Sequence, residues 1–440
     1  MKIQKRAVII LASMMVLGSS LAGCGGANKE EPAASGSNNQ TPATAKANLS
    51  IMWWGSQERH DATVKATEKY TEAHPNITFT PQYTDWDGYW KKLPTLAASK
   101  TLPDILQMDA TYIQEYAARG VLEDLSDMDL SDVIDSGVLE NSKIGGKLYG
   151  VPLSYNGNGF VYNKPELEAA GVTLPVQDWT YDQFFAFAEE AAEKLPDGKY
   201  GIGDYTNYWD TYQAYQMAYD KGPVFVDGVT LNIDKELWYK FEELYVDFRA
   251  RGVIPDAQTT FSMIENDPAS DPLISGRVMT RGVPVGAVGA LDSAVPGKLE
   301  IVNNPSGPSG GGWAQSTMYL SLSSTSKNKA AAKEFLKWFI SDPEAGTLLG
   351  TTRGIPISKV IFESIKDNLT PGELLGVKMY DMAAPKAMPF SPAPSGWADF
   401  VKTYSDTMTE VMFNKKTLDE AYEIIMNKGK EVQDKISSQG

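Results

Sequence analysis

The sequence lacks the residues on which most metal and redox chemistry depends. Its 440 residues contain one cysteine, Cys24, and two histidines, His60 and His74. A single cysteine cannot form an intramolecular disulfide, and two histidines without a cysteine partner do not supply the four ligands of a structural zinc site. We therefore predict no disulfide, no metal centre and no cofactor.

Signatures of nucleotide hydrolysis and of nucleophilic catalysis are absent or weak. The sequence contains no GxxxxGK[ST] motif, which excludes a P-loop. Residues 307–311 match GxSxG, but a nucleophile elbow needs a later histidine and both histidines precede it. We expect a glycine-rich loop there and no catalytic residue. Because 56 acidic residues allow many carboxylate pairs, a surface carbohydrate-active enzyme stays open as the alternative.

Basic residues are too few for a nucleic-acid-binding surface. Lys and Arg number 40 against 56 Asp and Glu, which gives a formal charge of −16. Four of the acids cluster in LEDLSDMDLSD: Asp124, Asp127, Asp129 and Asp132. No glycine occupies the sharp turn that an EF-hand loop requires, so we expect a solvated loop, with a calcium site as the alternative.

The one long apolar run lies at the N-terminus. Residues 1–24, MKIQKRAVIILASMMVLGSSLAGC, have a basic start, an apolar stretch too short to span a bilayer comfortably, and small residues before Cys24. LAGC resembles the bacterial lipobox, in which the cysteine is lipidated and the chain is cut just before it. We predict a signal peptide over 1–23 and lipid attachment at Cys24. An ordinary signal peptide with an incidental cysteine is the alternative.

Residues 24–47 are rich in Gly, Ala, Ser, Asn, Pro and Thr and lack apolar periodicity. This composition predicts a flexible tether, so that the folded part begins near Asn48. We expect an extracytoplasmic protein held at the outer face of the cell membrane.

From Asn48 onward, strand-like and helical segments alternate. Strands are predicted at 49–54, 77–83 and 103–109, and helices over 61–74, within 89–99 and before Gly120. This alternation predicts an α/β fold with crossover helices. Pro94 is expected to kink or restart the second helix.

Later helix starts are marked by capping residues. Thr180 with Gln183 predicts a capping box for a helix over 181–195, and Thr417 with Glu420 predicts another. Pro343 is placed to begin a helix after Asp342.

Between these helices, residues 145–164 read as two short extended runs where the chain leaves one lobe. We expect loops over much of 200–312, followed by a strand at 316–322 and a helix over 326–340.

Aromatic residues interleaved with polar ones are the main positive signal. They occur in WWGSQERHD, DWDGYW, TYIQEY, YTNYWDTY, GGWAQ and SGW, which we expect at strand ends or in loops. Ligands of open α/β sheets bind outside the carboxyl ends of strands. Flat rings and hydrogen-bonding side chains together suit a sugar, and residues 54–60 are predicted to form the first strand-to-helix loop of a cleft.

These segments resemble the extracellular solute-binding protein family 1, lipoproteins that deliver sugars and oligosaccharides to ABC importers. The resemblance covers residues 48–437 and is most specific in residues 53–93, LPDILQMDATYI, KLYGVPLSYNGNGFVYNK, SKNKAAAKEFLKWFIS and TTRGIPIS. Residues 51–125 are most similar to binding lipoproteins for pectin-derived oligosaccharides of the rhamnogalacturonan type.

The resemblance implies a two-lobe periplasmic-binding-protein fold with an inter-lobe hinge. One lobe would take residues 48–156 and 313–342, and the other 157–312 and 343–440. The implied partners are an oligosaccharide ligand, the transmembrane subunits of an ABC permease with a separate ATPase, and the membrane through the lipid anchor, with no nucleic acid. The chain would act as a monomer without catalysis. An adhesin for a host or wall polymer is a further alternative.

The resemblance also assigns a set of substrate-binding residues: Trp54, Gln57, Arg59, His60, Trp86, Asp87, Asp109, Tyr112, Asn156, Asn158, Trp209, Trp313 and Arg353. Because pectin fragments carry carboxylates, we predict that Arg59 and His60 hold a uronate. The alternative is that Arg59 pairs with Glu58 or Asp61 and orders the loop.

Overall fold

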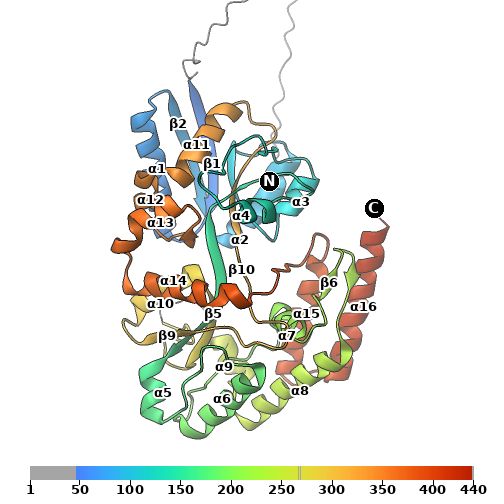
Figure 1. Cartoon of the computed structure of the whole chain (residues 1–440). Coiled ribbons are helices and arrows are strands. Elements are labelled where there is room, and N and C mark those ends of the chain that lie inside the picture. The colour runs from blue at the N-terminus through green and yellow to red at the C-terminus, as the bar shows by residue number, and fades with distance from the viewer. Residues whose placement is uncertain (1–45, 266, 268, 439–440) are drawn as a thin grey trace, which may run out of the picture. The chain divides into compact units, whose positions relative to one another are not determined.

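The computed structural model describes residues 46–438 except 266 and 268. Cys24, the predicted signal peptide and nearly all of the predicted tether lie outside these residues. The described residues form two five-stranded sheets with helices packed around them, and a two-stranded hairpin of β6 (Phe225–Val226) and β7 (Thr230–Leu231) (Figure 1).

The first sheet contains the strands that were predicted near the N-terminus. Its order is β2-β1-β3-β11-β4, with β1 at Ala47–Trp54, β2 at Ile77–Thr84, β3 at Ile105–Asp109, β11 at Met318–Leu322 and β4 at Val151–Pro152. β1 runs parallel to β2 and β3, and β11 runs antiparallel to β3 and β4. The α/β prediction is therefore confirmed.

Helix α1 (Gln57–Ala73) begins four residues earlier than predicted. Ser56 caps it by accepting a hydrogen bond from the Arg59 amide, so only Gly55 and Ser56 separate it from β1. Gln57, Arg59 and His60 therefore lie in the first turn of a helix, and the prediction of a loop over 54–60 is wrong.

Helix α2 (Trp86–Ala98) passes through Pro94 without a break. Asp85 caps it, with the Gly88 amide donating to Asp85 Oδ1 over 2.7 Å. Trp86, Asp87 and Trp90 consequently belong to a helix, which corrects the expectation that DWDGYW lies at a strand end or in a loop.

The long strand β5 (Ser154–Asn163) organises the second sheet. It pairs with β8 (Thr280–Pro284), β9 (Leu299–Val302), β10 (Ala314–Gln315) and β12 (Ile355–Pro356), all antiparallel. The chain passes from the first sheet to the second between β4 and β5, returns between β10 and β11, and passes to the second sheet again between β11 and β12. The two extended runs predicted within 145–164 are confirmed.

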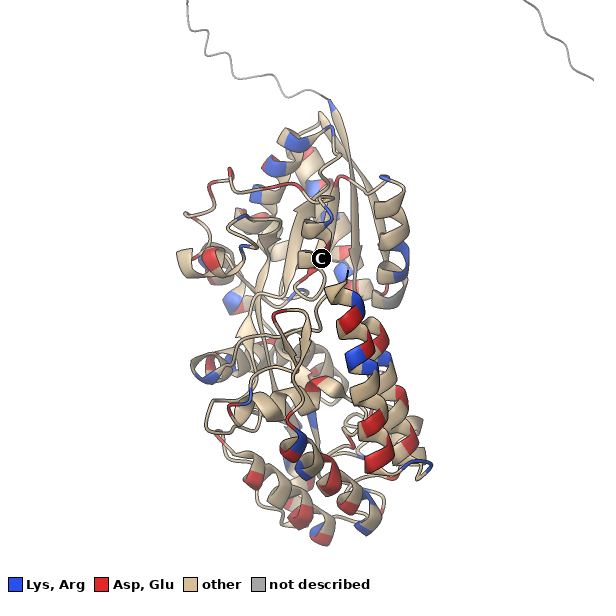
Figure 2. Cartoon of the chain, turned by 90° about the vertical axis from the view of Figure 1, so that its right-hand side faces the viewer, with Lys and Arg blue, Asp and Glu red and all other residues tan. Residues whose placement is uncertain are grey.

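The predicted helix caps are also confirmed. Thr180 and Thr417 form capping boxes at the starts of α6 (Tyr181–Lys194) and α16 (Leu418–Ser437). Asp342 caps α12 (Pro343–Leu349), which begins at a proline directly after α11 (Lys329–Ser341). The first half of α16 carries only acidic charges, and its second half carries both acidic and basic residues (Figure 2).

The remaining helices are α3 (Ile113–Ala118), α4 (Ser136–Asn141), α5 (Lys164–Ala170), α7 (Trp209–Ala218), α8 (Lys235–Arg251), α9 (Ala257–Ser262), α10 (Val288–Ala294), α13 (Lys359–Ile365), α14 (Pro371–Ala383) and α15 (Ala398–Met412). Of these, α3 is the one predicted before Gly120, and four, α7 to α10, lie where loops were expected. Residues 200–312 are thus more helical than predicted.

Each sheet has its own apolar core. The first core joins Ile51 of β1, Leu320 of β11 and Phe335 of α11, and also contains Ala345 and Leu349 of α12. A second core is built around Trp238, Phe241 and Trp397. Because α12 packs in the first core, we propose that the first lobe extends through α12, beyond the boundary predicted at residue 342.

The acidic segment around Asp127 is a solvated loop, as predicted. Asp124 Oδ1 accepts the Ser126 amide over 3.0 Å, and Asp127 and Asp132 pair with Lys333 and Lys337. Within the described ranges, no three His, Cys, Asp or Glu side chains are grouped to hold a metal ion. No described helix is long and apolar enough to cross a membrane.

Candidate functional site

The candidate site is a cavity of about 480 Å³ beside β5 and β8. This volume lies within the range of about 300–1,000 Å³ that is typical of small-molecule sites. Its walls come from β5, α7, β8, the segments 304–313 and 388–393, and Thr111 of the β3–α3 connection. Most of the lining therefore belongs to the second sheet and its helices, with one residue next to the first sheet.

Aromatic side chains line much of this cavity. Trp313 and Phe390 pack with their ring centroids 5.0 Å apart at an interplanar angle of 63°. Tyr208 is 45% exposed, and its ring centroid lies 6.4 Å from that of Tyr205. These rings offer flat apolar faces to a ligand.

The glycine run before Trp313 shapes the cavity wall. Gly312 has a φ of +67°, and a Cβ there would lie 2.4 Å from Asn304 Nδ2 and 2.9 Å from Asn158 Oδ1. Asn158 Oδ1 accepts the Trp313 amide over 2.8 Å, and Asn304 donates to the Asn158 carbonyl over 2.6 Å. The glycine-rich loop predicted at 307–311 is confirmed, and its role is close packing that positions Trp313.

Two carboxylates also line the cavity. Asp210 lies in the first turn of α7, where its Oδ1 accepts the Thr211 amide over 3.1 Å. Its side chain is exposed, but burial among the cavity walls raises the pKa of this carboxyl, and the charge of Glu265 raises it further. The exposed surface of Asp210 therefore faces the cavity.

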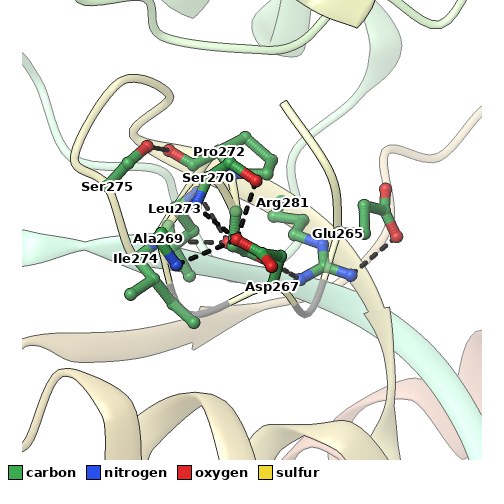
Figure 3. Close-up of polar contacts among 10 residues, drawn as sticks. Glu265, Asp267, Ala269, Ser270, Pro272, Leu273, Ile274, Ser275 and Arg281 are labelled. Carbon is green, nitrogen blue, oxygen red and sulfur yellow. Dashed lines mark hydrogen bonds and ion pairs between the residues drawn. The ribbon is translucent and has the colours of Figure 1, made fainter. Parts of the chain in front are cut away.

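Glu265 is held at the cavity by Arg281 of β8. Arg281 Nη2 contacts Glu265 Oε2 at 2.6 Å, and its Nη1 contacts Asp271 Oδ2 at 2.5 Å. Figure 3 shows the ion pair between Arg281 and Glu265, together with the hydrogen bonds that Asp267 accepts from the Ala269 and Ser270 amides. Arg281 is only 5% exposed, so this cation lies behind the carboxylate that reaches the cavity.

Two of the predicted substrate-binding residues, Asn158 and Trp313, line this cavity. Asp109 and Tyr112 flank Thr111, the lining residue nearest the first sheet. Asp109 Oδ1 accepts the Thr111 amide over 2.9 Å, and burial raises the pKa of Asp109 while this contact partly offsets the effect. The end of β3 thus places one carboxylate in contact with the lining residue Thr111.

Three other predicted residues, Trp54, Trp86 and Tyr112, meet in an aromatic cluster with Trp90. The Trp54 and Trp86 centroids are 5.2 Å apart, and those of Trp90 and Tyr112 are 4.0 Å apart. Trp54 is 5% exposed and belongs to the core, whereas Trp86 is 41% exposed. Of these three residues, only Trp86 presents a large open face, and none of them lines the cavity.

Arg59 and Arg353 connect α1 to the segment before β12. Arg59 Nε donates to the Thr352 carbonyl over 2.8 Å, and its Nη1 donates to the Trp54 carbonyl over 3.1 Å. Arg353 donates to Gln107 Oε1 and to Thr63 Oγ1, each over 2.9 Å. Burial lowers the pKa of Arg59 to about 10 and that of Arg353 well below its usual range.

His60 is part of the same buried region. Its Nδ1 accepts the Trp53 indole N–H over 3.1 Å, and burial followed by the charges of Arg59 and Arg353 lowers its pKa. This shift opposes the protonation that a bound uronate would promote. Asp61 accepts from Gln57 rather than from Arg59. None of Gln57, Arg59, His60 and Arg353 lines the cavity, so the uronate hypothesis stays a prediction.

The other predicted residues have structural contacts. Asn156 is buried and donates to Thr317 Oγ1 over 3.2 Å where the chain crosses between the sheets. Trp209 packs on Phe225 with centroids 5.2 Å apart. Asp87 lies in α2, and its side chain is outside what the structure describes.

Our sequence reasoning missed several lining residues. Tyr208 and Asp210 lie in YTNYWDTY, where Trp209 was chosen instead, and Phe390 sits among prolines in MPFSPAP. A proline-flanked aromatic outside any helical pattern was an available signal for a loop-borne ring. Glu265 and Asn304 carried no local signal.

Comparison with known proteins places the chain among binding proteins. Residues 65–370 match the bacterial extracellular solute-binding protein family. The diacetylchitobiose binding protein DasA of Streptomyces coelicolor is 25% identical over 452 residues, which cover 96% of this chain and 97% of that protein.

Solved structures support the same fold. The periplasmic oligogalacturonide binding protein of Yersinia enterocolitica, in complex with saturated digalacturonic acid, superposes with a TM-score of 0.76 at 23% identity, covering 88% of this chain and 99% of that one. The ABC substrate-binding protein Lmo0181 of Listeria monocytogenes, in complex with cycloalternan, gives 0.74 at 18%, covering 89% and 99%. The predicted two-lobe binding-protein fold is confirmed.

Proposed function

The chain belongs to the bacterial extracellular solute-binding protein family, and we propose that it captures an oligosaccharide in the cavity beside Trp313 for an ABC importer. The observation that carries this proposal is the lining, in which the rings of Trp313, Phe390 and Tyr208 stand among amide and carboxylate side chains. The C–H faces of a sugar stack on such rings, and its hydroxyls donate to carboxylates. Diacetylchitobiose, digalacturonic acid and cycloalternan in the names of related proteins agree with a saccharide ligand.

We propose that the two lobes close on the ligand. Two of the three crossings between the sheets, at 152–154 and 315–318, are short, which suits a hinge. Trp313 and Asp210 would hold the sugar first, and Thr111, with Asp109 beside it, would approach from the other lobe. Closure is favoured only if the ligand contacts both lobes, because a ligand shifts an equilibrium only through differential affinity.

The family is extracellular, and the chain is accordingly extracytoplasmic. We propose lipid attachment at Cys24, a monomeric state, and delivery of the ligand to the transmembrane subunits of a permease driven by a separate ATPase. The proposed role is binding without turnover.

A thermal-shift screen of oligosaccharides, followed by calorimetry on each hit, tests the proposal. A ligand at 100 times its Kd stabilises the protein by about 2.7 kcal/mol, which is readily measured. Trp313→Ala is expected to lower affinity at least tenfold. Phe413→Ala, which removes a 41% exposed ring outside the cavity, serves as the control.

Two results would contradict the proposal. If no oligosaccharide shifts the melting temperature, or if Trp313→Ala binds as tightly as Phe413→Ala, the cavity is not the sugar site. Shortened products after prolonged incubation of a hit with the protein would favour the carbohydrate-active enzyme.

A further inference from the structure

The charged residues that line the cavity have one sign. Among the described residues of the lining, Asp210 and Glu265 are the charged side chains, and no Lys, Arg or His joins them. Asp210 feels the charge of Glu265, so the two carboxylates share one electrostatic environment. An anionic ligand group entering this cavity would meet negative charge before it met any cation.

Two buried arginines, Arg281 of β8 and Arg249 of α8, are already paired with acids. Arg281 contacts Glu265 and Asp271, so this cluster holds two carboxylates against one guanidinium. Arg249, further behind the wall, contacts Asp204 Oδ2 at 2.6 Å and is also buried. Both guanidinium groups are almost fully shielded from water, and Arg249 can pair with a ligand carboxylate only by giving up Asp204, whose side chain has no exposed surface.

The remaining polar groups of the wall suit hydroxyls. Asp210 Oδ1 accepts one backbone amide. Both carboxylate oxygens of Asp210 can therefore accept further hydrogen bonds. Asn158 uses its Oδ1 for the Trp313 amide, and its Nδ2 has no protein partner among the described residues. The wall of this cavity therefore offers a carboxylate acceptor and an amide donor, which match the donor and acceptor of sugar hydroxyls.

We propose that this cavity takes an uncharged oligosaccharide and rejects its uronic-acid counterpart, an inference that rests on the proposed saccharide-binding function. It reverses the ligand charge predicted from the sequence. That prediction depended on Arg59 and His60 and on the likeness of residues 51–125, none of which belongs to the cavity wall except Thr111.

The test uses matched sugars that differ only in their carboxyl groups. Affinities are measured by calorimetry at pH 7.5 for two pairs of disaccharides: digalacturonic acid with galactobiose, and cellobiouronic acid with cellobiose. Each longer oligosaccharide that binds in the thermal-shift screen is then compared with its carboxyl-reduced or uronic counterpart. We expect the neutral member of a binding pair to be at least tenfold tighter. Equal affinities, or a tighter uronic member, would overturn the inference while leaving saccharide binding intact. Binding by no saccharide would instead contradict the proposed function.

Substitutions then assign the effect to the two carboxylates. Asp210→Asn keeps a side chain that can accept the Thr211 amide, and Glu265→Gln removes the second charge and one partner of Arg281. The neutral-to-uronic ratio is the affinity for the neutral sugar divided by the affinity for its uronic counterpart. Each substitution is expected to lower this ratio several-fold, and the double variant is expected to lower it most. Asp406→Asn, an exposed acid of α15, is the control and keeps the wild-type ratio. A ratio unchanged in the double variant, with the melting temperature preserved, would overturn the assignment.

Discussion

Glu242 of α8 is a buried acid whose ionisation can be read from stability. Its side chain has no exposed surface, Tyr404 donates to its Oε1 over 2.9 Å, and its Oε2 has no partner among the described residues. Burial raises the pKa of Glu242 well above its usual range. The charge of Asp204 raises this pKa further, by more than the charge of Arg249 lowers it. The folded protein therefore keeps a proton on Glu242 that the unfolded chain releases near pH 4.3.

The sign of the pH dependence follows from this difference. Above about pH 4.3 the folded state binds more protons at Glu242 than the unfolded state does, so rising pH lowers the free energy of unfolding. Each pH unit costs about 1.4 kcal/mol for as long as the folded carboxyl keeps its proton. Between pH 5 and pH 7 the loss from this group thus reaches at most about 2.7 kcal/mol.

Glu242→Gln removes the titration and keeps an acceptor for the Tyr404 hydroxyl. The stability of Glu242→Gln relative to the wild type is therefore expected to rise between pH 5 and pH 7, by up to the magnitude given above. Urea unfolding at pH 5, 6 and 7 measures this difference, in which the other titrating groups cancel. Glu243→Gln, an exposed neighbour on the same helix, is the control. A difference between Glu242→Gln and wild type that stays constant with pH would refute the reasoning.

Three further predictions concern ligand binding and attachment. Asp109→Ala is expected to weaken oligosaccharide binding about ten- to a hundredfold if Asp109 accepts sugar hydroxyls, because charge-assisted bonds contribute roughly 1.5–3 kcal/mol; unchanged affinity in calorimetry would remove it from the site. Arg59→Gln is expected to lower the melting temperature and to leave the neutral-to-uronic ratio unchanged, because Arg59 donates to carbonyls outside the cavity. A changed ratio would show that Arg59 contributes to ligand binding. Cys24→Ala is expected to release the protein from cells or to leave an uncleaved precursor, and a processed, lipid-labelled variant in the membrane fraction would contradict lipid attachment at Cys24.

Local signals predicted much of the fold. The strand-helix alternation after Asn48 and the capping boxes at Thr180 and Thr417 depend on neighbours in sequence, and all are present. Helix α8 was missed although Asp234 caps its start and Gly252, with a φ of +72°, ends it. These signals are as local as the ones that were used, so that error was avoidable.

The Trp53-Trp54 pair shows that a local aromatic pattern does not separate core residues from ligand-binding ones. Both rings are buried, and Trp53 donates to His60 within the core, so these two side chains stabilise the fold, while ligand binding by Gln57 and Arg59 stays a prediction. Gly55 belongs to the same arrangement, because a Cβ there would lie 2.5 Å from Arg59 Cδ.

The cavity could not be predicted from local signals, because its walls are distant in sequence. Asn158, Asp210, Glu265, Asn304 and Phe390 come together only through the pairing of β5 with β8 and β9 and through the return of the chain after α14. Asn158 was identified because it lies in a segment specific to the family resemblance, and Trp313 because it lies in the aromatic segment GGWAQ.

The position of β11 in the first sheet has a consequence for biogenesis. β11 lies between β3 and β4, and β4 has no other partner strand among the described residues. Strand β4 therefore cannot join the first sheet until residues 318–322 have been synthesised. More than a hundred and fifty residues separate β11 from β4, and contacts so far apart in sequence form late and slowly. A nascent chain therefore cannot complete its first sheet until the intervening residues 157–312 of the second lobe have been made. The first sheet thus remains incomplete for most of translation, which favours the unfolded state that passage through a narrow secretion channel requires.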